Sequence, residues 1–185
     1  MGSAARDAVT QMTTKDPNPR LRARALWVLA DIAETPQAAI EMALRDKSAD
    51  IRALALRIAR RHQLPVEPVV ARLVNDGSAL VRRECAVSLH RVESPEAVRL
   101  WTELALQYDG KDRWYLEALG IGETGRETAC LNAWQKRVGS KWSTPGNRDI
   151  IWRSRAPEAA PLLAGLLLHP AVPSTEHPRL VRAFD

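Results

Sequence analysis

Three glycines have the spacing of a phosphate-binding loop. Gly120, Gly122 and Gly125 form the pattern G-x-G-x-x-G within the segment ALGIGETGRE. Such a loop binds the pyrophosphate of a dinucleotide when a strand precedes its first glycine and a helix follows its last. The preceding segment, DRWYLEAL, instead has apolar residues at helical spacing. We therefore expect Gly120 to end a helix in the left-handed conformation. Ile121 is then expected to pack between helices, with Gly122 and Gly125 in the turn.

Charged residues recur along the chain with a period of thirty. Three aspartates, and the arginines that follow each of them by six positions, are Asp16, Asp46, Asp76, Arg22, Arg52 and Arg82. A row of guanidinium groups could bind the phosphates or carboxylates of a partner. Strict periodicity favours a structural role, because every repeat then needs the same contact. We expect the aspartates to cap backbone N–H groups at the turns before helices. The six residues are expected to form a hydrogen-bonded Asp–Arg ladder between adjacent repeats.

A second candidate binding surface combines aromatic and basic residues in the last third of the chain. Its members are Trp142, Trp152, Arg153 and Arg155. Tryptophan beside arginine can stack on nucleic-acid bases or hold a peptide. The interpretation that we favour is structural, with a tryptophan covering a helix end and arginines extending past it to solvent. If a partner-binding surface exists in this region, these four residues form it.

The residue types that perform covalent chemistry or bind metals are not arranged in a known pattern. The candidates are Cys85, Cys130, His62, His90, His169 and His177. The cysteines are far apart and neither belongs to a C-x-x-C-H haem motif, and no histidine has a metal-ligand spacing. We expect buried cysteines, histidines at solvated helix ends, and no catalytic residue, metal or cofactor. The sequence therefore predicts a protein that is not an enzyme.

The composition limits the class of protein. Of the 185 residues, 45% are hydrophobic and 26% are charged, which excludes a largely disordered chain. No apolar run approaches the roughly 18 residues of a transmembrane helix, and the first residues do not form a signal peptide. The net charge of +5 comes from 27 basic and 22 acidic residues. This charge permits a nucleic acid or an acidic partner without requiring either.

Helices must position all of these residues. After each periodic aspartate, the apolar residues follow helical spacing, with a small residue nine positions later at Ala25, Ala55 and Cys85. A degenerate fourth copy begins at Asp109, with Trp114 at the aliphatic position, Tyr115 in place of the arginine and Ala118 at the small position. We expect Trp114 to be buried, together with Trp101 and Trp134. Second helices are predicted over residues 36–45, 66–74, 95–107, 126–138 and 157–168.

The predicted fold is all-α, because no segment has the alternation of a strand. Since one helix pair cannot bury its apolar face alone, we expect an α-solenoid of about five helix–turn–helix repeats. Residues 1–185 are expected to form a single domain, with clear repeats over 16–120 and divergent repeats over 121–185. Residues 4–13 have the pattern of a second helix, and the final HPRLVRAFD has the pattern of the start of a first helix. We therefore expect the chain to be a fragment of a longer protein.

The pattern Asp-x4-aliphatic-Arg-x2-Ala resembles HEAT repeats of the short, phycobilisome-lyase-like type. This resemblance implies an armadillo-like superhelix that acts as a scaffold for protein–protein or interdomain contacts. The segments YDGKDRWYLEALGIG, RDIIWRSRAPEAAPLLAGLL and RLVRAFD resemble the HEAT region of large exported proteins of Planctomycetes and their relatives. There the repeats join a sorbosone-dehydrogenase-like propeller to a c-type cytochrome domain. That resemblance implies an interdomain spacer in a periplasmic or exported redox protein; otherwise we expect a cytoplasmic location.

Nucleic-acid binding is the remaining alternative. Some HEAT-like proteins are alkylpurine DNA glycosylases, with a basic groove, tryptophans and an acidic catalytic residue. The basic composition and the tryptophan–arginine group permit this role, but arginine is interleaved with acidic residues along the chain. The predicted partner is therefore a protein or a neighbouring domain of the same polypeptide, in preference to nucleic acid or a membrane.

Overall fold

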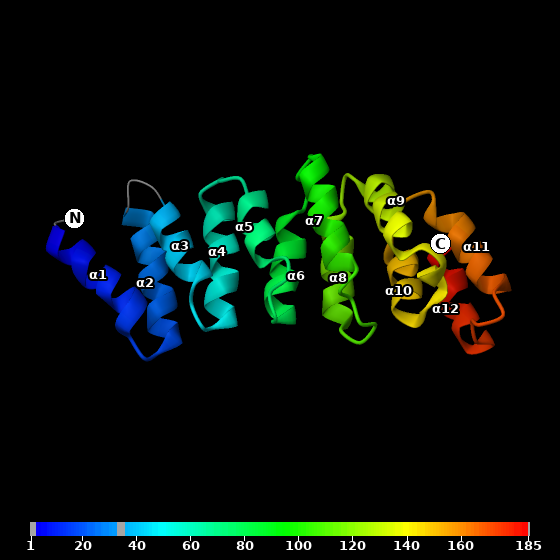
Figure 1. Ribbon diagram of the computed structural model, residues 1–185, viewed down its shortest axis with the longest axis horizontal. Coiled ribbons are helices and arrows are strands. Elements are labelled where there is room, and N and C mark those ends of the chain that lie inside the picture. Colours follow the sequence, from blue (N-terminus) through cyan, green and yellow to red (C-terminus); the bar gives the residue numbers. More distant parts are fainter. Residues whose placement is uncertain (1–2, 33–35, 185) are drawn as a thin grey trace. The chain divides into compact units, whose positions relative to one another are not determined.

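The computed structural model describes residues 3–32 and 36–184 (Figure 1). Within these residues, all regular secondary structure is helical, with twelve α-helices and three short 3-10 helices. The predicted all-α class is thus confirmed. None of the described helices is both long and apolar enough to cross a membrane. The chain divides into two compact units, which we call the N-terminal unit (Met1–Ser88) and the C-terminal unit (Leu89–Asp185).

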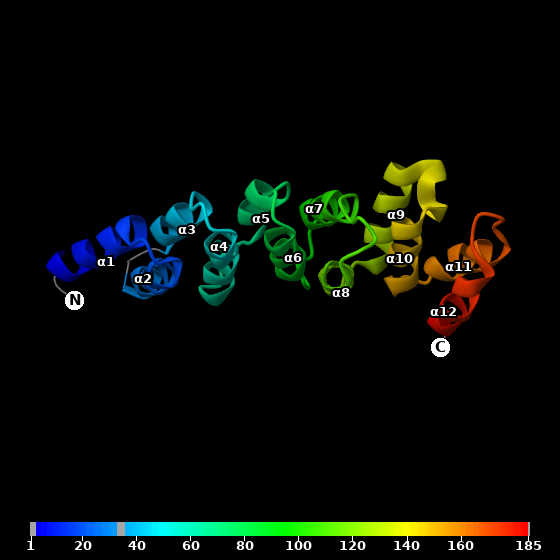
Figure 2. The ribbon, with the colours of Figure 1, turned by 90° about the horizontal axis from the view of Figure 1, so that it is seen from below.

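The N-terminal unit alternates two kinds of helix. Its helices are α1 (Ser3–Lys15), α2 (Pro19–Ile32), α3 (Gln37–Leu44), α4 (Ala49–Arg61), α5 (Glu67–Leu73) and α6 (Ala79–Ser88). Each helix packs against the next along the chain, and α4 also packs against both α2 and α6. Figure 2 shows α3 and α5 on one side of the unit and α2, α4 and α6 on the other. We call α2, α4 and α6 the first helices, and α3 and α5 the second helices.

Burial follows the helical spacing of the apolar residues. In α4, Ile51, Leu54 and Ile58 lie on the core side and are at most 5% exposed. The small residue expected in each repeat is also buried, with Ala55 and Cys85 fully inaccessible to solvent. A small side chain at this position lets neighbouring helices approach closely, so the repeat pattern in the sequence describes the packing surface of the first helices.

The C-terminal unit is also built from successive helices. They are α7 (Pro95–Ala105), α8 (Arg113–Gly122), α9 (Glu127–Val138), η1 (Gly139–Ser143), α10 (Pro145–Arg153), α11 (Ala159–Leu168), η2 (Ser174–Glu176), α12 (His177–Val181) and η3 (Arg182–Phe184). Helix α7 packs against α8 and α9, α8 against α10, and α11 against both α10 and α12. The predicted burial of Trp101 and Trp134 is confirmed, and the Trp101 indole N–H donates to the carbonyl of Leu119 at 2.8 Å.

The predicted burial of Trp114 is wrong. Its side chain is 72% exposed, whereas Tyr115 beside it is 2% exposed and donates its hydroxyl to the carbonyl of Leu104. The cause is a turn with one extra residue, because α8 is capped by Asp112, three positions after Asp109. In the earlier copies the residue before the first helix follows its aspartate by only two positions. Tyr115 therefore occupies the aliphatic position that the sequence pattern assigned to Trp114.

The predicted roles of Gly120 and Gly122 are wrong, whereas Gly125 lies in the turn as predicted. Gly120 and Gly122 lie within α8, and Gly125 is the one of the three with a left-handed φ, of +85°. The guanidinium of Arg153 lies directly against Gly120 and leaves no room for a side chain there. A Cβ atom at Gly120 would be only 2.3 Å from Cζ of Arg153. Ile121 is 40% exposed and does not fill a space between helices.

Candidate functional site

The turns before the first helices share one local geometry. The carboxylates of Asp16, Asp46 and Asp76 each accept the backbone N–H two residues later, at 2.8, 2.7 and 2.8 Å. This is an Asx turn, in which the side chain replaces a backbone acceptor. Each aspartate therefore orders the turn two residues before the helix cap, and its other carboxylate oxygen stays available for a further donor.

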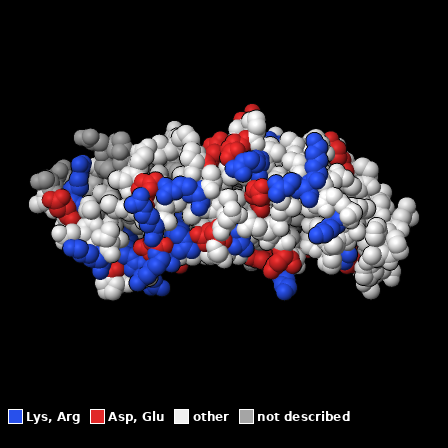
Figure 3. Space-filling view, in the orientation of Figure 1, with Lys and Arg blue, Asp and Glu red and all other residues white. Residues whose placement is uncertain are grey.

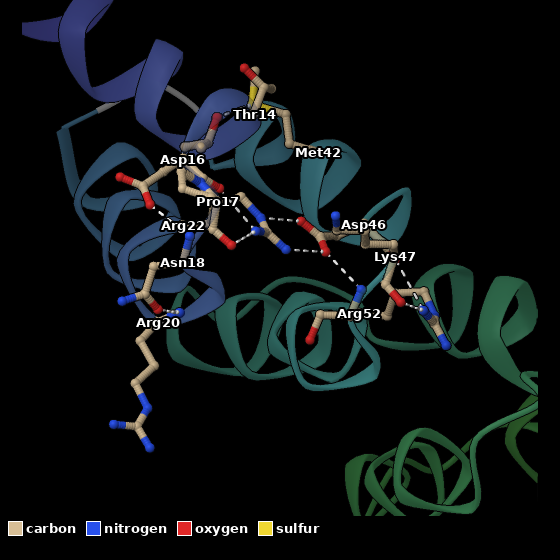
Figure 4. Close-up of polar contacts among 12 residues, drawn as sticks. Thr14, Asp16, Pro17, Asn18, Arg20, Arg22, Met42, Asp46, Lys47 and Arg52 are labelled. Carbon is tan, nitrogen blue, oxygen red and sulfur yellow. Dashed lines mark hydrogen bonds and ion pairs between the residues drawn. The ribbon is translucent and has the colours of Figure 1, made fainter.

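Arg22 on α2 connects its own turn to the next one (Figure 4). Its Nε and one terminal nitrogen donate to the two carboxylate oxygens of Asp46, both at 2.9 Å. The other terminal nitrogen donates to the backbone carbonyls of Asp16 at 3.0 Å and Pro17 at 3.3 Å. Arg22 is only 4% exposed. A buried guanidinium thus holds the α1–α2 turn against the α3–α4 turn.

Arg52 on α4 repeats these contacts thirty residues later. It donates to the two carboxylate oxygens of Asp76 at 2.6 and 2.9 Å, and to the backbone carbonyls of Asp46 and Lys47 at 3.0 and 3.1 Å. Bidentate, charge-assisted arginine–carboxylate pairs are stronger and more directional than single hydrogen bonds. The hydrogen bond from Arg52 lowers the pKa of the Asp76 carboxyl against the opposing effect of burial.

A third arginine–carboxylate pair of this kind lies in the C-terminal unit and was not predicted. Arg148 on α10 donates to the two carboxylate oxygens of Glu176 at 3.0 and 2.6 Å, and to the backbone carbonyl of Ser143 at 2.9 Å. Arg148 is 6% exposed. A signal was present in the sequence, because Glu176 is followed by Val181 and Arg182 with the spacing of Asp46, Ile51 and Arg52. A search for aspartate alone overlooks it.

Arg82 also takes part in the ordering of its turn. It donates to the backbone carbonyl of Asp76 at 2.6 Å, as Arg22 and Arg52 do to their own aspartates. In the fourth copy the equivalent position is Leu116, since Tyr115 has moved to the aliphatic position. The leucine side chain has no hydrogen-bond donor, so α8 has no arginine at this position with which to continue the ladder.

The four residues of the predicted aromatic–basic surface contact three different helices. The ring of Trp142 in η1 lies edge-on to His169, with centroids 5.7 Å apart, next to Gly165 of α11. The indole N–H of Trp152 donates to the backbone carbonyl of Arg179 on α12 at 3.1 Å, and the Arg179 guanidinium stacks on its ring at 4.4 Å. Both tryptophans are therefore engaged in contacts within the C-terminal unit.

The two arginines of that set differ in environment. Arg153 donates from Nε to Glu117 on α8 at 2.9 Å and is largely buried against Gly120. Arg155 is exposed. Of the four predicted residues, Arg155 is exposed and the other three are half-buried.

A groove lies between α7 and α9, and the sequence analysis did not identify it. Its volume is about 530 Å³, and its apolar floor includes Pro95, Val98, Ala129 and Ala133. A neighbouring hollow of about 560 Å³ shares three of these residues, so the two are continuous along the helix pair. We call this the α7–α9 groove. Basic residues border it at Arg99, Lys136 and Arg137.

Charged groups of both signs line a hollow of the N-terminal unit. This hollow, of about 690 Å³, lies beside the Arg22–Asp46 pair and includes Lys15, Glu41 and Arg45. Figure 3 shows the same mixture, with Lys and Arg side chains next to Asp and Glu. The Arg22 and Arg52 guanidiniums are bound to carboxylates, so these two side chains are not free cations for a phosphate or carboxylate of a partner.

Glu123 is a titratable residue that the sequence analysis missed. It is 2% exposed, near Trp101, Leu119 and Ile150 between α8 and α10. The Ser154 hydroxyl lies 3.4 Å from one carboxyl oxygen, while the other oxygen has no hydrogen-bond partner among the described residues. Burial raises the pKa of Glu123 to about 7, against the opposing effects of the Arg155 backbone N–H and the charge of Arg153.

The expected burial of the two cysteines is confirmed, since Cys85 and Cys130 are free thiols inaccessible to solvent. Burial raises the pKa of Cys85, and it raises that of Cys130 to about 12, so neither is a reactive thiolate at neutral pH. In the part of the chain that the structure describes, no group of three or more His, Cys, Asp or Glu side chains could hold a metal ion.

Comparison with known proteins adds no assignment to this geometry. The chain matches no protein-family model, no curated protein and no solved structure.

Proposed function

We propose that this protein is a non-enzymatic, HEAT-like α-solenoid that serves as a scaffold for another protein or for a neighbouring domain of its own polypeptide. The observation that supports it most strongly is the recurrence of one contact. Arg22, Arg52 and Arg148 each join a carboxylate of a later turn to backbone carbonyls just before their own helix. Arg22 and Arg52 keep the thirty-residue period, and Arg148 makes the same kind of contact outside it. A recurring contact of this kind sets a similar geometry at each step, and stacked repeats form extended surfaces.

The α7–α9 groove is the surface that we assign to the partner. Its floor consists of small apolar side chains, which favour the close approach of a helix or an extended segment. At its border, Arg99 pairs with Glu96 and Arg137 pairs with Glu103, whereas Lys136 is exposed and has no ion-paired partner among the described residues. The groove therefore suits an apolar segment that carries an acidic residue near Lys136.

A binding experiment tests this role. The full chain would be immobilised and exposed to an extract of its source organism, and the retained proteins would be quantified. We expect near-stoichiometric retention of one protein by the native chain and its loss in Ala129→Glu and Ala133→Glu, which place carboxylates in the groove. Ala160→Glu on the exposed side of α11 is the matched control and should retain the partner. Retention that is equal in all variants would contradict the assignment.

The resemblance to propeller–cytochrome proteins makes a covalently linked neighbour the first partner to examine. If the chain is an interdomain spacer, a separately produced neighbouring domain should bind it, and the same groove variants should weaken that binding. If the neighbouring domain binds but the groove variants do not weaken its binding, the spacer role stands and the α7–α9 groove is not the binding surface.

A further inference from the structure

A hollow lies between α8, α10 and α12 in the C-terminal unit. Its volume is about 410 Å³, within the range of small-molecule sites. The residues that line it differ from those that line the α7–α9 groove. We call it the α8–α10–α12 hollow, and its lining includes Lys111, Arg113, Leu116, Trp152 and Arg179.

Leu116 lines this hollow at the position where the ladder has an arginine. Arg22 and Arg52 bind from that position to the carboxylate of the next turn. The turn before α8 instead lies against the backbone of α10, since a Cβ atom at Gly110 would be 3.2 Å from Cα of Gly146. Leu116 thus gives the hollow an apolar wall where the ladder would place a guanidinium already neutralised by a carboxylate.

Basic side chains outnumber acidic ones in the lining of the hollow. The cations are Lys111, Arg113, Arg179 and Arg182, and the carboxylates are Glu117 and Asp149. Both carboxylates have partners. Asp149 binds Arg179 at 2.6 Å and accepts the Tyr108 hydroxyl at 3.3 Å. Glu117 binds Arg153 at 2.9 Å. The lining therefore has an excess of positive charge that its own carboxylates do not neutralise.

Lys111 and Arg113 are free to turn toward a ligand. Lys111 is exposed and has no ion-paired partner among the described residues. The Arg113 side chain is 84% exposed, and its ion pair with Glu117 is long, at 3.9 Å. The nearby carboxylates of Asp109 and Asp112 accept backbone N–H groups of their own turn and the start of α8, and neither residue lines the hollow.

Arg179 and Trp152 form a fixed wall of the hollow. The Arg179 guanidinium stacks on the Trp152 ring, 4.4 Å from its centroid, and also pairs with Asp149. The indole N–H donates to the Arg179 backbone carbonyl at 3.1 Å. A cation whose position is set in advance loses little conformational entropy when an anion binds. The hollow thus combines one fixed cation, flexible cations and apolar side chains.

We propose that the α8–α10–α12 hollow binds a small phosphate monoester, with its phosphate group among Lys111, Arg113 and Arg179 and its organic group against Leu116 and Trp152. Guanidinium and ammonium groups suit phosphate oxygens. The excess of positive charge favours a dianion, and the apolar walls favour an ester over inorganic phosphate. This site is independent of the α7–α9 groove, so either can be correct without the other.

Isothermal titration calorimetry of the full chain tests the site, with phenyl phosphate and inorganic phosphate as the probes. At low ionic strength, phenyl phosphate should bind one site per chain with a Kd of about 1 mM or tighter. Inorganic phosphate should bind at least about three-fold more weakly, because it has no apolar group to bury. Equal affinity for the two probes would overturn the assignment of the organic group to Leu116 and Trp152.

Charge variants locate the phosphate group. Lys111→Glu and Arg113→Glu should each weaken phenyl phosphate binding by about five-fold or more. Lys136→Glu makes the same charge change at the α7–α9 groove and should bind phenyl phosphate like the native protein. Asp149→Asn removes a carboxylate from the lining but keeps an oxygen for Arg179, and it should tighten binding by about three-fold.

Circular dichroism and urea unfolding establish that each variant is folded before its affinity is compared. Absence of phenyl phosphate binding to the native chain at about 5 mM would overturn the proposal. Equal weakening in Lys111→Glu and Lys136→Glu would do the same, because the loss would then follow net charge and not the hollow.

Discussion

Arg22 binds both carboxylate oxygens of Asp46 at 2.9 Å, although twenty-four residues separate them in the chain. The pair is nearly inaccessible to solvent, with side-chain exposures of 5% and 11%. The same guanidinium also binds backbone carbonyls of the turn that precedes α2. One side chain thus satisfies acceptors from two successive turns, which makes it a direct link between local turn geometry and the packing of neighbouring helices.

Removal of this arginine should strongly destabilise the N-terminal unit. Arg22→Ala removes the arginine donor from two carbonyls and from the carboxylate of Asp46, which keeps only the N–H of its Asx turn. We expect a loss of about 2–4 kcal/mol in the free energy of unfolding. Arg22→Lys should recover only part of this loss, because an ammonium group cannot make the two-pronged contact. Urea unfolding followed by circular dichroism measures both values. Arg24→Ala, at an exposed position of the same helix, should change stability by no more than about 0.5 kcal/mol.

The contribution of Asp76 should depend on pH in the acid range. Its hydrogen bonds from Arg52 hold the folded-state pKa below the ordinary value of 3.8, against the effect of burial. A lowered folded-state pKa means that the stabilisation is complete above the unfolded-state pKa and is lost as pH falls through the folded-state value. The stability difference between native protein and Asp76→Asn should therefore be constant near neutral pH and shrink below about pH 4. A difference that stays constant down to pH 2 would be incompatible with this ion pair.

Glu123 should have the opposite dependence. Burial raises its folded-state pKa from 4.5 to about 7. For a raised pKa, the stabilisation is complete below the unfolded-state value and is lost as pH rises through the folded-state value. Stability should therefore decrease between about pH 4.5 and pH 7 because of this residue. Glu123→Gln should remove that decrease and be more stable than native protein at pH 8, by on the order of 2 kcal/mol. Parallel unfolding curves for both proteins from pH 5 to pH 8 would contradict the burial of a titrating carboxyl.

Gly120 and Arg153 should be energetically coupled. Alanine normally stabilises a helix interior by roughly 0.5–1 kcal/mol relative to glycine. In the native protein, Gly120→Ala must displace the Arg153 guanidinium, which would otherwise lie 2.3 Å from the new methyl group. We therefore expect little gain, or a loss, in the native background and the full gain in Arg153→Ala. Thermal unfolding of the four proteins gives the coupling directly, and additive effects would show that the two residues do not compete for space.

The sequence predicted the features that depend on the thirty-residue repeat and on the helical spacing of apolar residues. The thirty-residue spacing of Asp16, Asp46 and Asp76 identified the turns, and helical spacing identified the buried residues of α4. It failed where one inserted residue shifts the register, as at Trp114, because the pattern was counted from Asp109 and not from the helix cap. Glu176 was missed because glutamate can accept the same arginine contact as aspartate.

Contacts between helices that are distant in the sequence could not be predicted from local residue patterns. Glycine often ends a helix, and Gly120 was predicted to do so. The guanidinium of Arg153 on α10 lies against Gly120, which explains why a glycine is found inside α8. Glu123 follows α8 as an ordinary polar residue in the sequence, and only the packing of α8 against α10 makes it buried. Trp142 and Trp152 are close in the sequence, yet they contact different helices in the C-terminal unit.

The most direct test of the repeated contact is a double-mutant cycle at Arg148 and Glu176, with Arg52 and Asp76 as the reference pair. The coupling energy of each pair comes from urea unfolding of the native protein, the two single alanine variants and the double variant. If one arginine–carboxylate contact joins repeats in both units, each pair should have a favourable coupling energy of about 1.5–3 kcal/mol. A coupling energy near zero for Arg148 and Glu176, with a normal value for the reference pair, would contradict the account.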